Sequence, residues 1–329
     1  MKKWYIVNIL IILLAAGAWS AANDSVVKAY AGFIGLDRDN RVVTLIGDTQ
    51  VTREWEFWGE HNRDETGRLL DEIVRRLPAA VLNLGDLVSF GASNRDRRLF
   101  DRLHQPLLEA GIPFFPVLGN HDYYGDDEQA LNHYFSRVPH LAGRRWYSFV
   151  FRNVGFIMLD SNFKRMGEIR LRHQQAWYEA ELARMQSDTG IRFIVACCHH
   201  PPFTNNQGKR PDPELRTRLA EPFLATGKAA LFFSGHIHTY ERFRFGDKYF
   251  VVSGGGGGTR SLVETNPVFQ FHHDEFNGEE LRFFHFCELE IADRALYTQV
   301  IRLNENGVFS VADSFVVEDS FQRERLLGP

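Results

Sequence analysis

The chain has 329 residues, of which 44% are hydrophobic and 24% are charged, and its formal net charge is −4. This composition is ordinary for a globular protein, and the length suffices for one large domain or two small ones. The slightly acidic balance gives no compositional support to nucleic-acid binding.

The first 22 residues have the layout of a secretory signal peptide. Two lysines precede an apolar stretch from Trp4 to about Trp19, and small residues follow up to Ala22. The stretch is a little short of the roughly 20 residues that span a bilayer. We therefore expect export to the periplasm or the extracellular space. The alternative is an uncleaved N-terminal anchor, which would be the one source of stable membrane association.

A polar lead-in over 23–40 is followed by apolar runs that alternate with helical patterns. The runs predict buried strands, and in chain order they are RVVTLIGD, AAVLNLGD, IPFFPVLGNHD, VGFIMLD, IRFIVACCHH, AALFFSGHIH and KYFVVSGGGGG. Apolar residues spaced three and four apart predict helices over 64–77, 94–110, 127–135 and 171–185. Three further strands, FFHFCELEI, ALYTQVIRL and VFSVADSFVV, follow. This pattern predicts one α/β domain over 41–317 and a tail over 318–329.

Metal-binding residue types gather where these strands end. The candidates are Asp48, Asp86, Asn120, one of His199 and His200, His236 and His238. The carboxyl ends of strands form the edge of an open α/β sheet where ligands bind. Carboxylate, amide and imidazole donors suit Mn, Fe or Zn. Together these residues predict a metal site.

The motifs GD, GD, GNHD, HHPP and GHIH, in this order from Gly47 to His238, resemble those of the calcineurin-like metallophosphoesterases. The segments GHIHTYER and SGGGGG are similar to the purple acid phosphatase-like members. The resemblance implies an α/β fold, a four-layer α/β/β/α sandwich of two mixed β-sheets flanked by helices. It also implies a centre of two divalent or trivalent metal ions, with Mn, Fe or Zn as candidates.

The resemblance assigns metal-binding roles residue by residue. Asp86 would bridge both ions. The other expected ligands are Asp48 and His238 for the first ion, and Asn120, His199 and His236 for the second. His199 is preferred over His200 because it stands two residues before Pro201, as the family ligand usually does. His200 stays open as a ligand or as a neighbour of one.

The resemblance also implies catalytic residues. His121 corresponds to the histidine over the reaction centre, and Asp122 would orient its imidazole. Tyr123 and Arg242 lie near motif ends and are candidate substrate contacts. Substrate choice should depend on the loops over 87–97, 161–170, 203–212 and 254–280. The glycine tract over 254–258 is expected to be an approach surface for substrate or a flexible turn.

Two positions depart from the family pattern. Many members carry D-x-H in the first motif, whereas this chain has Gln50 in place of the histidine. Its amide oxygen could bind the first ion, or its amide could form a hydrogen bond only. Purple acid phosphatases have a tyrosine three residues after the bridging aspartate, and this chain has Ser89 there. The purple colour should therefore be absent.

The expected function is metal-dependent hydrolysis of phosphate esters, so the protein would be a hydrolase. It would act as an acid-phosphatase-like phosphomonoesterase that uses a hydroxide held between the ions. The substrate would be a phosphorylated small molecule. The alternative within the same class is a phosphodiesterase or nucleotide pyrophosphatase. The alternative from another class is a non-catalytic metal-binding envelope protein.

Overall fold

The computed structural model describes residues 29–37, 39–52 and 60–319. The expected signal peptide therefore lies outside the described residues. Within the described ranges, no helix is both long enough and apolar enough to cross a membrane.

The first of two sheets is built from both ends of the domain. Its strand order is β12-β11-β10-β1-β2-β3. Strands β1, β2 and β3 run parallel, and β10 pairs antiparallel with β1. The bounds are β1 (Val42–Ile46), β2 (Ala80–Asn83), β3 (Phe114–Pro116), β10 (Phe284–Ile291), β11 (Ala295–Leu303) and β12 (Phe309–Glu318). The C-terminal strands thus complete the sheet that the N-terminal strands begin.

The second sheet comes from the middle of the chain, in the order β4-β5-β6-β7-β9-β8. Four central strands run parallel, and β4 and β8 pair antiparallel at the two edges. The bounds are β4 (Tyr147–Phe151), β5 (Val154–Met158), β6 (Phe193–Cys198), β7 (Ala229–Ser234), β8 (Tyr240–Phe245) and β9 (Lys248–Ser253). Both sheets are mixed, and this confirms the expected architecture.

The alternation of side chains along β6 builds two cores. Val195 and Cys197 belong to a core that joins both sheets, whereas Ile194 and Ala196 belong to a second core with the helices outside. Successive residues of a strand point to opposite faces, so a fully apolar strand can serve both layers.

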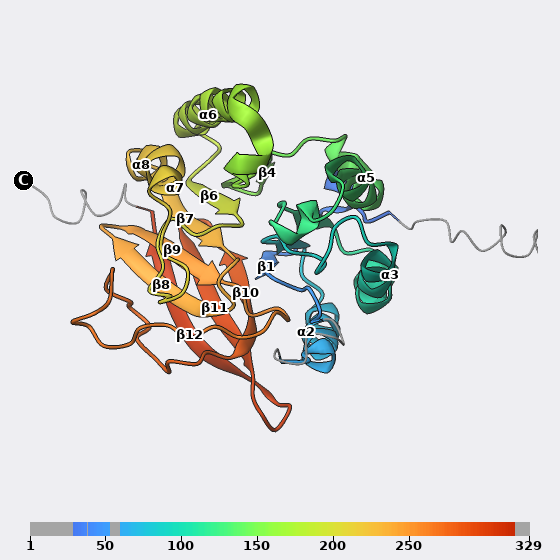
Figure 1. The fold of residues 1–329 in the computed structure, drawn as a ribbon. Helices are drawn as coiled ribbons and strands as arrows, with labels where there is room; N and C mark the ends of the chain where they lie inside the picture. Colours follow the sequence, from blue (N-terminus) through green and yellow to red (C-terminus); the bar gives the residue numbers. More distant parts are fainter. Residues whose placement is uncertain (1–28, 38, 53–59, 320–329) are drawn as a thin grey trace, which may run out of the picture.

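Helices cover the outer faces of the sheets. Figure 1 shows α2, α3 and α5 together on the right and α6, α7 and α8 together at the upper left. The helix bounds are α2 (Arg63–Arg76), α3 (Asn94–Leu103), α4 (Gln105–Glu109), α5 (Asp127–Arg137), α6 (Phe163–Ser187), α7 (Pro213–Leu215) and α8 (Glu221–Leu224).

Several elements differ from the sequence-based expectation. The strands β4 and β8 were not predicted, because edge strands keep exposed and charged residues such as Arg244. The helix expected over 94–110 is two helices, with Pro106 in the first turn of α4, where the missing N–H costs least. Helix α6 begins at Phe163 and bends at Gly167, whose φ is 70°. Tyr30, from the expected lead-in, is buried in the main core.

Candidate metal centre

The candidate ligands meet at one edge shared by the two sheets. Asp48 and Asp86 follow β1 and β2 of the first sheet, and His199 follows β6 of the second. Atoms of these three side chains that could bind a metal all lie within 4.8 Å of one another. Backbone hydrogen bonds join the loops, since Asp48 N donates to Gly85 O at 3.0 Å. Residues far apart in the sequence therefore form one buried cluster.

Three candidate ligands have strained backbones. The φ angles of Asp48, Asp86 and His236 are 60°, 55° and 67°, in the left-handed region. That conformation costs a non-glycine residue roughly 1–2 kcal/mol. Strain of this kind persists where surrounding structure enforces it, and it concentrates at functional sites.

The first group of donors consists of Asp48, Gln50 and His238. The Nε2 atom of His238 lies 3.4 Å from Oδ1 of Asp48, and its Nδ1 donates to the carbonyl of Thr259 at 2.6 Å. The Gln50 amide nitrogen is best satisfied by donating to the backbone carbonyls of Asp48 and Asp86, at 3.0 Å each. Its amide oxygen then lies 3.1 Å from Nε2 of His238.

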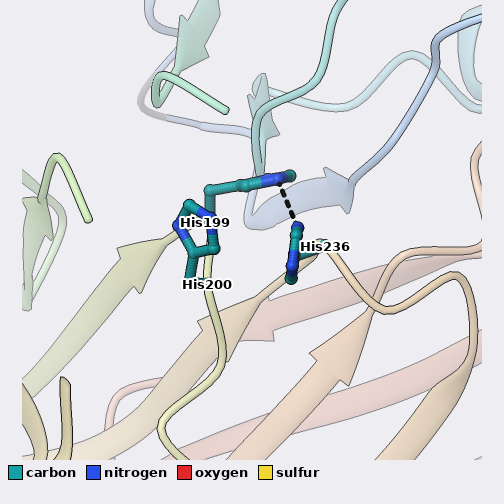
Figure 2. Close-up of side chains that lie close together, drawn as sticks. All are labelled: His199, His200 and His236. Carbon is teal, nitrogen blue, oxygen red and sulfur yellow. Dashed lines mark hydrogen bonds between the residues drawn. The ribbon is translucent and has the colours of Figure 1, made fainter. Parts of the chain in front are cut away.

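The second group surrounds His199. Its Nε2 atom lies 3.3 Å from Oδ2 of Asp86, 3.2 Å from Oδ1 of Asn120 and 3.3 Å from Nδ1 of His236. Figure 2 shows the contact with His236 as a dashed line. Nδ1 of His199 donates to the carbonyl of Leu84 at 2.8 Å, so its Nε2 faces this group.

His200 has a different environment from its neighbour. Its Nδ1 lies 2.8 Å from Oγ of Ser161, and its backbone N–H donates to the same oxygen at 2.9 Å. Its ring nevertheless lies near His199 and His236, and the three form a second candidate metal-binding group (Figure 2). The carboxylate and amide oxygens surround His199, whereas the serine hydroxyl anchors His200.

Buried charges shift the pKa values in this cluster. Burial alone would raise the pKa of Asp86, but the charges of His199 and His121 hold it below its usual value. Burial would lower the pKa of His199, but Asp86 raises it to about 9. Burial and the neighbouring histidines lower the pKa of His236. Burial and the charge of His199 lower the pKa of His200 to about 3.

The donor atoms fit a bound cation. Nδ1 of His199 and of His238 donates to a carbonyl, so loss of the proton on Nε2, as binding of a cation requires, leaves a lone pair there. These lone pairs face the acceptor oxygens of Asp86, Asn120 and Gln50. A cation satisfies such a cluster of acceptors, and imidazoles anchored through their second nitrogen are typical of metal ligands.

Glycines let the backbone pack against the ligands. A Cβ atom at Gly119 would come closer than 3.0 Å to Asp86, at Gly235 to Asp48, and at Gly258 to the imidazole of His238. The tract over 254–258 is buried throughout. The sequence had suggested an approach surface for substrate or a flexible turn. The structure shows instead that the tract packs closely against the candidate ligands.

His121 lies beside Asp86. Its Nδ1 donates to the carbonyl of Ser89 at 2.8 Å, and its Nε2 is 3.9 Å from Oδ2 of Asp86. Its backbone N–H donates to Oδ1 of Asp86 at 2.8 Å. The imidazole is partly exposed.

Asp122 does not orient His121, contrary to the expectation. Its carboxylate is fully buried and accepts hydrogen bonds from Gly119 N at 3.0 Å and Leu87 N at 3.2 Å. Arg97 donates to it at 3.3 Å, and both side chains are almost completely buried. The carbonyl of Ser89 takes the place expected for Asp122. Sequence reasoning missed Arg97, because nothing in the highly charged helix α3 distinguishes it.

The two candidate substrate contacts are also wrong. Tyr123 is 0% exposed, and its hydroxyl donates to Asp160 at 2.5 Å inside the protein. Arg242 forms an ion pair with Asp313 at 2.8 Å and lies over the ring of Phe315. Burial and pairing leave neither side chain free to contact a phosphate at the centre.

Comparison with known families matches most of the domain. The family model of calcineurin-like phosphoesterases matches residues 41–240. This range contains every candidate ligand described above.

Plant purple acid phosphatases are among the similar curated proteins. Purple acid phosphatase 21 of Arabidopsis thaliana is 25% identical over 241 residues, which are 67% of this chain and 54% of the relative. Purple acid phosphatase 1 of Ipomoea batatas is 28% identical over 178 residues, 50% of this chain and 36% of the relative. The chain thus spans about half the length, or less, of these relatives.

Solved structures share the fold at low identity. A purple acid phosphatase from yellow lupin (Lupinus luteus) seeds has a TM-score of 0.67 at 18% identity, with 88% of this chain and 55% of that chain covered. A dimetal phosphatase from Danio rerio has a TM-score of 0.58 at 16% identity, with 85% and 99% covered.

Proposed function

The chain belongs to the calcineurin-like phosphoesterase family, and on this premise we propose that it is a metal-dependent phosphomonoesterase. The observation that carries the proposal is the position of Asp86. Its carboxylate lies 3.3 Å from Nε2 of His199, and one of its oxygens lies within 4.8 Å of a carboxylate oxygen of Asp48, which is 3.4 Å from Nε2 of His238. One bridging carboxylate between two donor groups suits two cations.

The two donor groups would each hold one ion. Asp86 would serve both. The first ion would take Asp48, His238 and the amide oxygen of Gln50, and the second would take Asn120, His199 and His236. Bound cations would supply an acidified water and offset the negative charge of the phosphoryl group.

His121 would donate a proton to the leaving group. Since Nδ1 donates to the carbonyl of Ser89, the other nitrogen, Nε2, is the one that faces the centre. A protonated ring could donate from Nε2 to a departing alkoxide oxygen. Asp122 and Arg97 would act at a distance, by fixing the loops that carry Asp86 and Asn120.

Gln50 should make the first ion the more weakly held of the two. An amide oxygen carries no charge, and Gln50 stands where many relatives have a histidine. We expect Gln50→His to tighten binding of the first ion by about tenfold or more, measured by titration against a competing chelator. Equal affinities in the two proteins would contradict a ligand role for this position.

With Ser89 in place of tyrosine, iron-loaded protein should show no visible charge-transfer band.

The catalytic proposal is tested with two chromogenic substrates. We expect metal-loaded protein to release nitrophenol from p-nitrophenyl phosphate faster than from bis(p-nitrophenyl) phosphate. Asp86→Asn should reduce kcat/KM by more than about 100-fold and lower the metal content. Faster turnover of the bis-ester would establish a phosphodiesterase instead. Failure to cleave either ester with both ions bound would favour the non-catalytic alternative.

We further propose export through the N-terminal segment over 1–22, on its charge and hydropathy pattern. Intact-mass measurement of protein from the native host should show a chain shortened by that segment. Recovery of the full-length chain from the membrane fraction would establish the anchored form.

A further inference from the structure

A pocket of about 340 Å³ opens directly beside the second donor group. Asn120, His200 and His236 form the wall that it shares with the metal centre. Most of the rest of its lining comes from the start of α6, from the loop that leads into α7 and from α7 itself. The volume is that of a small-ligand site, so the part of a substrate that extends beyond the phosphoryl group can occupy it.

Four cationic side chains line this pocket: Lys164, Arg165, Lys209 and Arg210. Lys209 donates to the backbone carbonyl of His236 at 3.1 Å, which ties this cluster to a candidate ligand. The lining therefore carries four cationic side chains, and one of them contacts the wall that the pocket shares with the centre.

The two carboxylates in the pocket are engaged elsewhere. Asp212 accepts from the backbone N–H of Glu214 at 2.8 Å, as the N-terminal cap of α7. Glu214 forms an ion pair with Arg218 at 2.8 Å. Neither carboxylate is thus committed to neutralising the lining cations.

Two of the four cations have no protein partner in the described part of the chain. Arg165 forms an exposed ion pair with Asp127 at 3.2 Å, of the kind that contributes little to stability. For Lys164 and Arg210, no hydrogen bond or ion pair occurs with another described residue, and both side chains are exposed. They are available to an anion from outside.

We propose that this pocket is a subsite for a second anionic group on the substrate, a carboxylate or a phosphate on the leaving group. The inference rests on the proposed phosphatase function and narrows its substrate class to phosphate esters of anionic alcohols. Lys164 and Arg210 would provide most of the selectivity, since charge-assisted contacts to a carboxylate or phosphate are the strong ones. Asn120 and His236 at the shared wall place the subsite within reach of the reacting phosphoryl group.

Three esters that differ only in the leaving group test the subsite. Ethyl phosphate leaves a neutral alcohol, phosphoglycolate leaves a carboxylate, and ethylene glycol bisphosphate leaves a second phosphate. We expect kcat/KM for each of the two anionic esters to exceed that for ethyl phosphate by about tenfold or more. The more favoured of the two identifies the anion. The preference should shrink as ionic strength rises, because exposed charges are screened.

A double variant and a matched control locate the effect. Lys164→Ala/Arg210→Ala should reduce the ratio of kcat/KM for anionic over neutral esters by about tenfold, mainly through KM. Arg98→Ala/Arg102→Ala removes the same charge from the exposed face of α3, outside the pocket, and should preserve the ratio. An equal loss in both double variants would overturn the subsite and indicate a general charge effect.

Direct binding separates failure of the subsite from failure of the catalytic proposal. 3-Phosphonopropionate and propylphosphonate have equal length, cannot be hydrolysed, and differ in a terminal carboxylate or methyl group. Calorimetry with the metal-loaded protein should show about tenfold tighter binding of the first, and the pocket variant should lose this difference. If the wild-type protein shows this difference and the pocket variant loses it, but neither protein hydrolyses any of the esters, the result would support the subsite and refute hydrolysis. Equal affinities in the wild-type protein would refute the subsite, whatever the turnover.

Discussion

Gly258→Ala probes the wall of glycines around the first donor group. The new Cβ would come closer than 3.0 Å to three atoms of the His238 imidazole. The φ angle of Gly258 is not in the left-handed region, so the effect is a clash with the side chain and not backbone strain. Either the ring moves, or the tract that carries Gly258 moves.

The cost of this change follows from overpacking. Inserting a methyl group into a close-packed site costs about 1–3 kcal/mol, which for a domain of this size corresponds to a fall in Tm of about 2–6 °C. If the ring of His238 moves, affinity for the first ion should fall by about 10–100-fold. Thermal unfolding of the metal-free protein measures the first effect, and chelator competition measures the second.

Gly67→Ala is the matched control. Gly67 lies in α2, and a Cβ there would meet nothing within 4 Å. Alanine should raise the free energy of unfolding by about 0.5–1 kcal/mol through helix propensity, with metal affinity unchanged. If Gly258→Ala retained the wild-type Tm and metal affinity, the packing argument would be refuted. If it lost stability but kept its affinity, the glycine tract would have moved and not the ring of His238.

Three further changes test other parts of the site. His121→Ala should lower kcat for ethyl phosphate by about 100-fold or more, but much less for p-nitrophenyl phosphate, whose leaving group needs no proton; a parallel loss of metal content would refute the acid role. Arg97→Met should lower the free energy of unfolding in urea by about 3–5 kcal/mol, because it leaves the Asp122 carboxylate buried without its partner. Adding Asp122→Asn should recover part of that loss. An unchanged free energy of unfolding in Arg97→Met would contradict the pairing. Burial raises the pKa of Glu241 from 4.5 to about 7, so the folded state holds a proton that the unfolded chain has lost, and stability should fall as pH rises through that window. Glu241→Gln should remove this part of the slope, measured by Tm against pH, and an unchanged profile would exclude Glu241 as its source.

Local sequence patterns identified the strands and the residues at their ends. A run such as AALFFS is apolar on both faces, which suits a strand buried between two layers. The polar residue that follows each run must lie at the sheet edge, whichever strands become neighbours. The prediction of Asp48, Asp86 and His236 as one group needed no more than this rule.

Side-chain partners could not be read in the same way. Asp122 pairs with Arg97, and Tyr123 with Asp160, 25 and 37 residues away in the chain. Arg242 pairs with Asp313, 71 residues away. Asp122, Tyr123 and Arg242 all lie near a motif, and from the sequence alone each was expected to have a functional role. Only the packing of distant elements shows that a buried or paired partner already satisfies it.

The adjacent histidines show the same division most clearly. The sequence determined by itself that strand β6 ends in two imidazoles, and that donors of metal-binding type end the neighbouring strands. The tertiary structure decided that His199 faces Asp86 and Asn120 whereas His200 faces Ser161. It also decided that the glycine tract is a packed wall and that a cationic pocket adjoins the centre. The physical reason is that strand periodicity is a local property, whereas burial, hydrogen-bond satisfaction and charge clustering depend on segments brought together by folding.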